Sequence, residues 1–395
     1  MMKQEELING LSAVRPMEAE EIQEALELAV SQVRRNLPFF NGGFPGACSR
    51  DGLYTRTAND DWTNGFYTGM LWLSYEETGE VVFKQEALRQ ADDFLERIQK
   101  RIVVDHHDMG FLYSPSCVAA YKLAEYETGK EAALMAADNL LGRFQDKGGF
   151  FQAWGLLGAA ENYRLIVDCL LNVPLLFWAT QVTGEEKYRE KAVIHIETSM
   201  KYLLREDYST YHTYYFDPET GEALRGATQQ GNRNDSIWAR GQAWGIYGSA
   251  LSYGVLRKEE YLDIFRKVTD CFLEHLPEDL VPYWDFDFRE GSSEPRDSSS
   301  GAIAACGMLE MAAYLPDKEA DKYREMGSKL LKALTDTCLN REGNAGSGIL
   351  QHGTYAKSSP ENGVSDSGVD EYTLWGDYFY MEGLTRLKRN WVRYW

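Results

Sequence analysis

Two aspartates have the surroundings that acid–base chemistry requires. Asp168 lies in an apolar run, 164–172, at the start of a predicted helix. Desolvation there would raise its pKa and let it hold a proton at neutral pH, as a general acid must. The alternative is a helix N-cap, where the helix terminus would favour the ionised form. Asp108, in 106–111, is expected to face Asp168, and two carboxylates in one pocket push their pKa values apart.

Four tryptophans in predicted loops or helix starts are candidates for a sugar site: Trp62, Trp154, Trp238 and Trp244. An indole offers a flat apolar face, and the polar neighbours of these residues offer hydrogen bonds, which together suit a sugar ring. The alternative for each tryptophan is a place in the hydrophobic core.

The densest polar cluster spans 226–244. Arg240 and Trp244 are four residues apart and so share one helical face, where a planar guanidinium beside an indole suits a carboxylate-bearing ring. The alternative for Arg240 is an ion pair with a structural aspartate such as Asp235. His212, just before this cluster, is by itself more typical of a structural histidine than of a catalytic one.

The sequence contains none of the motifs that mark several common kinds of enzyme chemistry. The chain has no phosphate-binding glycine loop, H-E-x-x-H, G-x-S-x-G or C-x-x-C, so nucleotide, zinc-protease, serine-hydrolase and redox functions lack support. His106 and His107 are adjacent and form no recognised metal-ligand spacing. We therefore predict neither a metal nor a cofactor.

Charge and composition limit the classes of binding partner and the cellular location that we expect. The chain has 41 Lys and Arg against 61 Asp and Glu, a net charge of −20, which opposes binding to nucleic acid or an anionic membrane. The N-terminus resembles no signal peptide, and no run of about 18 apolar residues occurs, so a cytoplasmic location is expected. The six cysteines are scattered singly and are expected to be reduced core residues.

Helices in a repeated order must position these residues. Three apolar segments end alike at Gly79, Gly129 and Gly184, each suited to the left-handed position after a helix. More amphipathic helices follow at 84–100, 130–144 and 187–204. The series continues with apolar helices at 237–255, 300–314 and 372–387 and amphipathic helices at 259–276, 318–338 and near 18–35.

This alternation predicts an all-α fold, an (α/α)6 barrel of six inner and six outer helices in a single domain, residues 1–395. The long connections precede the inner helices and should cluster at one end as the site. They are 55–68, 105–117, 146–172, 207–244, 284–301 and 344–376. A short strand is possible at 281–288; little else is typical of a strand.

Five segments together resemble the unsaturated glucuronyl hydrolases of glycoside hydrolase family 88: 61–66, 107–111, 168–172, 238–244 and 375–379. The resemblance runs in the same order from about residue 18 to 390, and the R-G-Q-A-W stretch at 240–244 is its specific part. That family has an (α/α)6 barrel and acts on small oligosaccharides that begin with the 4,5-unsaturated uronic acid left by polysaccharide lyases.

The resemblance implies hydration of an enol ether, with Asp168 acting first as acid and then as base. It also implies that Asp108 binds ring hydroxyls and tunes Asp168, and that His212 and Gln230 position the water. The residues expected to line the sugar site are Trp62, Trp154, Trp238, Arg240 and Trp244. The role of Arg240 as partner of the substrate carboxylate is inferred from residue types alone.

Other functions stay open at this stage. An unsaturated rhamnogalacturonyl hydrolase would perform the same hydration on a pectin fragment. A sugar epimerase on a similar barrel would need two histidine bases, and a sugar-binding protein would bind without turnover. The segment 357–363 could reach a second sugar and hold sulfate, or form a surface turn.

Overall fold

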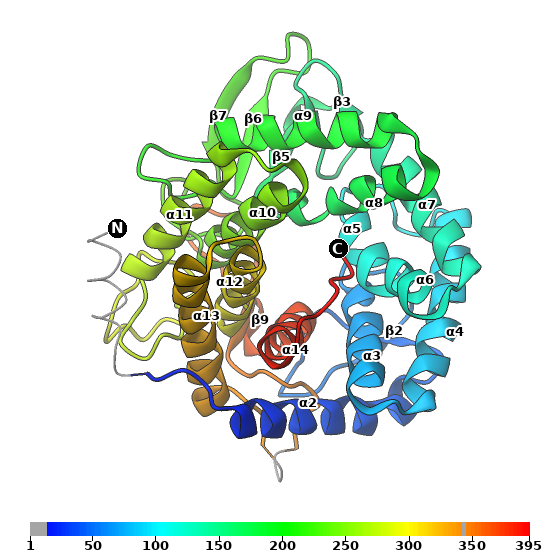
Figure 1. Cartoon of the computed structure of the whole chain (residues 1–395). Helices are drawn as coiled ribbons and strands as arrows, with labels where there is room; N and C mark the ends of the chain where they lie inside the picture. Colours follow the sequence, from blue (N-terminus) through cyan, green and yellow to red (C-terminus); the bar gives the residue numbers. More distant parts are fainter. Residues whose placement is uncertain (1–13, 342–344) are drawn as a thin grey trace.

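The computed structural model describes residues 14–341 and 345–395, and its helices form two concentric rings, an (α/α)6 barrel (Figure 1). The outer ring contains α2 (Ala19–Phe40), α4 (Val81–Gln99), α7 (Glu127–Leu141), α9 (Glu186–Tyr202), α11 (Glu259–Glu274) and α13 (Asp317–Thr337). The inner ring contains α3 (Asn64–Thr78), α5 (Met109–Tyr113) continued by η1 (Ser114–Val118) and α6 (Ala119–Ala124), η3 (Val167–Leu171) with α8 (Pro174–Thr183), α10 (Ala239–Leu256), α12 (Ser298–Ala312) and α14 (Leu374–Lys388).

Burial distinguishes the two rings as the sequence predicts. Every residue of α12 is buried, whereas α11 buries one face and exposes charged residues on the other. Glycines let the inner helices approach closely. A Cβ added at Gly307 would come 2.7 Å from the Tyr247 Cα, and one at Gly65 would come 2.2 Å from the Phe111 carbonyl oxygen.

Two of the three predicted helix-ending glycines are confirmed. Gly79 and Gly184 have φ of 72° and 76°, the left-handed conformation that glycine adopts without strain. The prediction for Gly129 is wrong, because the inner helix ends at Glu125 and Gly129 lies inside α7. The inner helix has a wider, π-helical turn at η1, which contains Pro115. Gly129 serves close packing instead, since a Cβ there would lie 2.7 Å from the Cys117 carbonyl oxygen.

Short β-strands lie in the loops of the barrel, so the expectation that the chain has almost no strands is wrong. Antiparallel pairs form between β1 (Phe44–Pro45) and β2 (Arg56–Thr57), β3 (Phe144–Gln145) and β4 (Phe150–Phe151), and β8 (Gly353–Ala356) and β9 (Ser367–Glu371). A three-stranded sheet contains β5 (Arg164–Ile166), β6 (Thr213–Phe216) and β7 (Ala223–Ala227) in that order. The possible strand at 281–288 forms only isolated bridges, such as Trp238 with Asp285.

The segment that follows α14 turns back into the ring, where the C-terminus lies near the centre in Figure 1. The Trp395 ring stacks on Phe379 at 5.9 Å and contacts Phe111 at 6.2 Å, and its indole nitrogen donates to Glu382. These contacts fill the barrel axis beneath the predicted site.

The six cysteines are unpaired, as expected, and five of them are buried. Within the described residues, no helix is long and apolar enough to span a membrane.

Candidate active site

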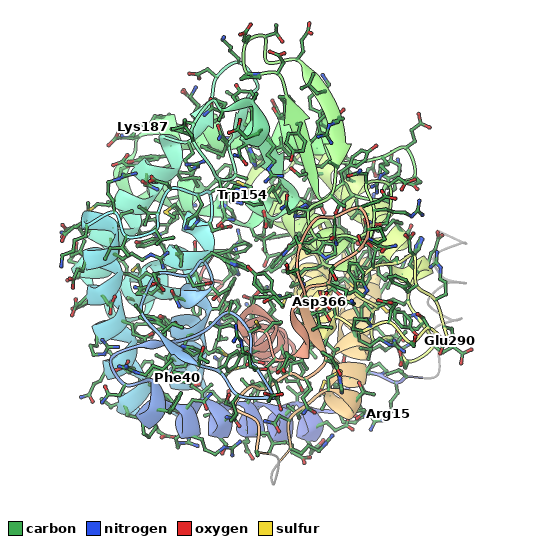
Figure 2. The ribbon with its side chains drawn as sticks, turned by 180° about the vertical axis from the view of Figure 1, so that it is seen from behind. Arg15, Phe40, Trp154, Lys187, Glu290 and Asp366 are labelled. Carbon is green, nitrogen blue, oxygen red and sulfur yellow. The ribbon has the colours of Figure 1, made fainter. Side chains whose placement is uncertain are left out.

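The predicted site residues gather at the end of the barrel where the inner helices begin. Asp108 immediately precedes α5, Asp168 lies in the first turn of η3, and Trp238 precedes α10. The view in Figure 2, from the side opposite to Figure 1, shows Lys187 near the outer edge of the molecule and Trp154 inward of it. The long loops before the inner helices therefore bring distant segments to one mouth.

The two aspartates meet at a histidine. The Nε2 of His107 lies 3.4 Å from Asp108 Oδ1 and 3.4 Å from Asp168 Oδ1. His107 is fully buried, and the Oδ1 atom of Asp168 is buried with no hydrogen-bond partner among the described residues. An unpaired buried carboxyl oxygen is costly unless the group is protonated or receives a ligand.

Electrostatics shift the pKa values of the two carboxyl groups in opposite directions. Burial and the nearby charge of Asp108 raise the pKa of Asp168 well above its ordinary value. Burial acts in the same direction on Asp108, but His107, His106 and Asn172 offset it, so the pKa of Asp108 lies below its ordinary value. Burial lowers the pKa of His107 to about 4, which leaves its imidazole neutral at pH 7. A neutral His107 adds no charge that would ionise Asp168.

Asn172 and His106 hold Asp108 in place. Asn172 donates its Nδ2 to Asp108 Oδ1 at 3.4 Å and accepts the backbone N–H of Phe111 at 2.8 Å. The Nδ1 of His106 accepts the backbone N–H of Asp108 at 3.1 Å and lies 3.1 Å from Asp108 Oδ2.

Asp168 is not a helix N-cap, since η3 has no side-chain cap and Ile166 occupies that position. The capping alternative, which would have lowered the pKa of Asp168, is therefore wrong.

Aromatic rings surround the carboxyl groups. Trp62 is partly exposed, stacks on Trp375 at 5.2 Å and donates its indole N–H to the Tyr355 hydroxyl at 3.0 Å. Trp244 is buried and packs on Phe111 at 5.3 Å, so in this structure it supports the floor of the site from below. These rings provide both a stacking surface and a rigid base for it.

His212 and Gln230 lie on the side of the mouth formed by the three-stranded sheet. His212 Nδ1 accepts the backbone N–H of Gln229 at 2.9 Å, so the proton of the neutral ring is on Nε2. Burial lowers the pKa of His212 well below its ordinary value, and its ring meets Trp238 edge-on at 4.8 Å. Gln230 donates to the Tyr355 carbonyl oxygen at 3.4 Å.

Arg240 is bound tightly by the protein itself. Its Nη1 forms an ion pair with Asp297 Oδ2 at 2.6 Å, and its guanidinium also donates to the carbonyl oxygens of Thr354 and Tyr355. Asp235, the partner considered from the sequence, pairs with Arg233 instead. The structural alternative for Arg240, an ion pair with an aspartate, is therefore correct with Asp297 in place of Asp235, and each of its two Nη atoms already donates to the protein.

The segment 357–363 forms a turn that is bound to Asp366, three residues beyond it. Lys357 lies 3.2 Å from Asp366 Oδ2, and the Ser358 hydroxyl donates to Asp366 Oδ1 at 2.6 Å. Asp366 lies over the middle of the molecule in Figure 2. The positive charge of this loop is therefore already paired.

Sequence reasoning missed the joint role of His107 and Asn172 and the burial of Arg164 beside Trp154. Asn172 lies four residues after Asp168, a spacing that could have signalled it; nothing local signals the other contacts, which arise between loops.

His107, Asp108 and Asp168 each offer a ligand atom within 4.8 Å of one another and are the described residues able to hold a metal ion. Such an ion requires ionised Asp168, which burial disfavours, so the group suits a proton better.

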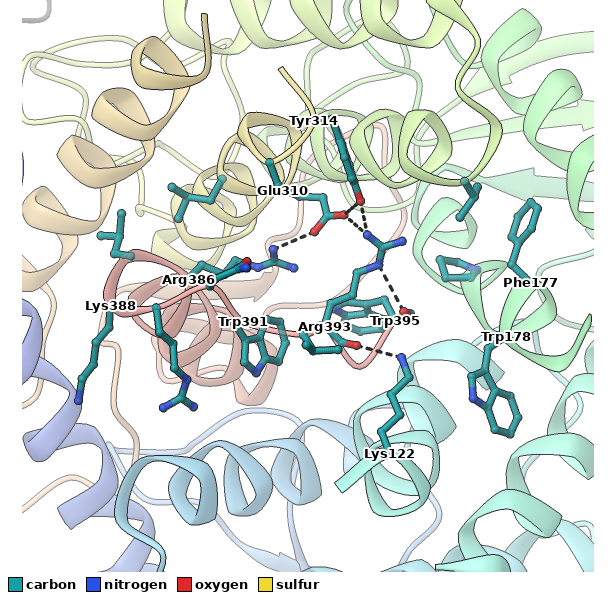
Figure 3. Close-up of a pocket in the computed structure, with 18 of the residues that line it drawn as sticks. Lys122, Phe177, Trp178, Glu310, Tyr314, Arg386, Lys388, Trp391, Arg393 and Trp395 are labelled. Carbon is teal, nitrogen blue, oxygen red and sulfur yellow. Dashed lines mark hydrogen bonds and ion pairs between the residues drawn. The ribbon is translucent and has the colours of Figure 1, made fainter. Parts of the chain in front are cut away.

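A cavity of about 900 Å³ lies at the ends of the inner helices remote from this mouth (Figure 3). It is lined by Trp178, Glu310, Arg386, Arg393 and Trp395, among others, and by none of the predicted site residues. Its arginines are paired, for example Arg386 with Glu310 at 2.8 Å. This cavity adds no chemical group to the mouth.

Comparisons with known proteins agree with the geometry. Residues 44–310 match the sequence profile of Glycosyl Hydrolase Family 88. An unsaturated chondroitin disaccharide hydrolase of Streptococcus pyogenes serotype M1 is 49% identical over 380 residues, 95% of this chain and 93% of that protein. The crystal structure of unsaturated glucuronyl hydrolase from Streptococcus agalactiae has a TM-score of 0.92 at 46% identity and covers 96% of this chain and 95% of that one.

A mutant of the same S. agalactiae enzyme complexed with dGlcA-GalNAc6S has a TM-score of 0.85 at 42% identity, with 98% of this chain and 97% of that chain covered. Both the sequence similarity and the structural similarity extend over nearly the whole length of each protein. The barrel, the paired carboxyl groups and these relatives lead to one conclusion: the chain belongs to glycosyl hydrolase family 88.

Proposed function

We propose that this protein is an unsaturated glucuronyl hydrolase that releases the 4,5-unsaturated uronic acid from lyase-generated glycosaminoglycan oligosaccharides. The observation that carries the proposal is the buried Oδ1 of Asp168, free of protein donors and next to Asp108 and His107. Burial raises the pKa of this carboxyl group and so favours the protonated form that the first step requires. Membership of family 88 and the dGlcA-GalNAc6S complex of a relative support the substrate class.

The reaction begins at the C4=C5 double bond of the unsaturated ring. Asp168 donates its proton to C4, and positive charge develops at C5 and the ring oxygen. The resulting Asp168 carboxylate then takes a proton from a water molecule, whose oxygen bonds to C5. The hemiketal that forms opens and expels the remaining sugar. One water is consumed, and Asp168 ends protonated, ready for the next cycle.

Neighbouring groups make these steps possible. Ionised Asp108 accepts hydrogen bonds from ring hydroxyls and, as a nearby negative charge, maintains the high proton affinity of Asp168. His212, with its proton on Nε2, and Gln230 orient the water. Trp62, Trp154, Trp238, Arg240 and Trp244 shape the sugar pocket, with Trp62 and Trp154 partly exposed and the other three supporting it from within.

The test follows the ultraviolet absorbance of the conjugated double bond with unsaturated chondroitin, hyaluronan, heparin and rhamnogalacturonan disaccharides in parallel. Loss of absorbance with a glucuronyl disaccharide is expected. A preference for the rhamnogalacturonan disaccharide would assign the alternative activity on pectin fragments. No change with any of the four, from folded protein, would overturn hydration altogether and favour an epimerase or a binding protein.

The proposed compartment is the cytoplasm. Six unpaired cysteines, five of them buried, suit a reducing environment. Cell fractionation followed by the absorbance assay tests this, with activity expected in the cytoplasmic fraction.

A further inference from the structure

Arg164 is a buried cation beside the mouth that the mechanism above does not use. It is the first residue of β5, four positions before Asp168, and it is 4% exposed. Its guanidinium lies 4.3 Å from the Trp154 ring and 5.2 Å from the Tyr215 ring. The two rings fix the plane of the guanidinium, as is usual for arginines that recognise planar or tetrahedral anions.

The charge of Arg164 is not neutralised by the protein. Among the described residues, no carboxylate lies within ion-pair distance of it, and its Nε is buried without a hydrogen-bond partner. Its Nη1 donates to two neutral oxygens, the Tyr215 hydroxyl at 2.5 Å and Gln229 Oε1 at 3.0 Å. A buried cation without a counterion and with an unpaired N–H is unfavourable, and a ligand with a negatively charged oxygen would remove both costs.

Other buried arginines of the chain are satisfied differently. Arg240 pairs with Asp297, and Arg97 and Arg143 donate to backbone carbonyl oxygens, such as Ile102 and Gln152. The hydrogen-bond partners described for Arg164 include no backbone carbonyl. It is thus the exception among arginines of similar burial.

The location of Arg164 connects it to the substrate site. Trp154 is one of the residues expected to contact the sugar, and Gln229 donates its backbone N–H to His212. The positive charge of Arg164 also contributes to the lowered pKa of both His212 and His107, which places all three groups in one electrostatic field. The cation of the segment 357–363, Lys357, already has Asp366 as its partner.

We propose that Arg164 binds an oxyanion of the substrate, either the carboxylate of the unsaturated uronic acid or a sulfate ester on the adjoining sugar. Both present the same chemistry, oxygens that share a negative charge and accept the Nε–H and Nη–H donors. Arg164, rather than Arg240, supplies the positive charge that an acidic substrate needs on a protein of net charge −20. This inference rests on the function proposed above.

The test compares Arg164→Met, Arg164→Lys and a control, Arg225→Gln, in steady-state absorbance assays. Arg225 also stacks on Tyr215, at 4.6 Å, but is exposed at the surface. Unsulfated and 6-sulfated unsaturated chondroitin disaccharides serve as the two substrates. We expect Arg164→Met to raise KM by about 30-fold with kcat changed less than about threefold, as for loss of a charge-assisted hydrogen bond used in binding. Arg225→Gln is expected to leave KM within about twofold.

The two substrates distinguish the two anions. An equal rise in KM for both assigns Arg164 to the uronate carboxylate, and a rise for the sulfated disaccharide alone assigns it to sulfate. An unchanged KM for both in a folded variant overturns the proposal. If Arg164→Met does not fold, Arg164→Lys decides: it keeps the charge but loses the planar fork, so a KM rise of about fivefold supports the proposal and none overturns it.

Binding without turnover separates this inference from the proposed function. Sodium glucuronate and inorganic sulfate are titrated into wild type and Arg164→Met, with thermal stabilisation as the readout. Stabilisation of wild type by either anion, and its loss in the variant, supports the anion site even if no disaccharide is hydrolysed. Equal responses of the two proteins to both anions would contradict it, whether or not the enzyme is active.

Discussion

Asp377 makes the stability of the barrel depend on pH in a way that can be isolated. Its carboxylate is fully buried near the start of α14, where Oδ1 accepts the backbone N–H groups of Ile349 and Leu350 and Oδ2 accepts the Tyr54 hydroxyl. Burial raises the pKa of Asp377 to about 7. These bonds anchor the segment leading into β8, whose carbonyl oxygens hold Arg240.

The sign and size of the effect follow from linkage. The unfolded chain releases this proton near pH 4, whereas the folded protein keeps it until about pH 7. Between these values the native state binds more protons, so its stability falls as pH rises and levels off above pH 7. A difference of about 3 units at 1.36 kcal/mol each gives a loss of about 4 kcal/mol from this one group.

Asp377→Asn removes the titration while keeping the shape and an acceptor for both backbone N–H groups. Urea unfolding followed by circular dichroism at pH 4.5, 5.5, 6.5 and 7.5 measures the free energy of unfolding of variant and wild type. We expect the variant to gain about 3–4 kcal/mol relative to wild type across this range. Asp366→Asn is the control, because burial is slight there and hydrogen bonds from Ser358 lower the pKa of Asp366 to about 2, below the range tested. Parallel curves for Asp377→Asn and wild type would refute the reasoning.

Further predictions concern the proton donor, its neighbour and the packing of the inner ring. Asp168→Asn should reduce kcat by at least about 1000-fold with an unchanged circular dichroism spectrum, because the amide is isosteric but transfers no proton; substantial activity in a folded variant would remove Asp168 from its role. Asp108→Asn should shift the alkaline limb of the pH–rate profile to lower pH, since loss of the neighbouring charge lowers the pKa of Asp168, and an unshifted limb would count against that coupling. Gly307→Ala should lower the free energy of unfolding in urea by about 2 kcal/mol, because its Cβ would lie 2.7 Å from the Tyr247 Cα; wild-type stability would contradict such close packing.

The sequence was sufficient to predict the barrel because each ring has a local signature. Inner helices such as α12 are apolar on every side, and outer helices such as α11 have one apolar face, so both patterns can be recognised without knowing their neighbours. Gly129 was misassigned because a glycine is needed there for close packing against Cys117, and not to end a helix. That reason lies in another element and leaves no trace in the local pattern.

The candidate site was predictable in its residue types but not in its connections. Asp168 was identified from its apolar surroundings, Asp108 from a loop expected to face it, and both from the family resemblance; the structure places both at His107. The partners of Arg240 and the isolation of Arg164 depend on β-strands and loops that meet only after folding. Ion pairs between residues far apart in the chain have no periodicity, so a single sequence does not reveal them.

The ring closes where α14 packs against α2 and α3, elements separated from it by about 300 positions in the sequence. A closed ring has no terminal repeat, so it needs no polar capping helix and cannot fray inward from an end as an open helical array can. Closure also requires the last inner helix to find the first ones across almost the entire chain, a high contact order that slows folding. An arc of five helix pairs would leave the apolar flanks of α3 and α12 uncovered, which makes the unclosed ring the species most prone to aggregate during synthesis.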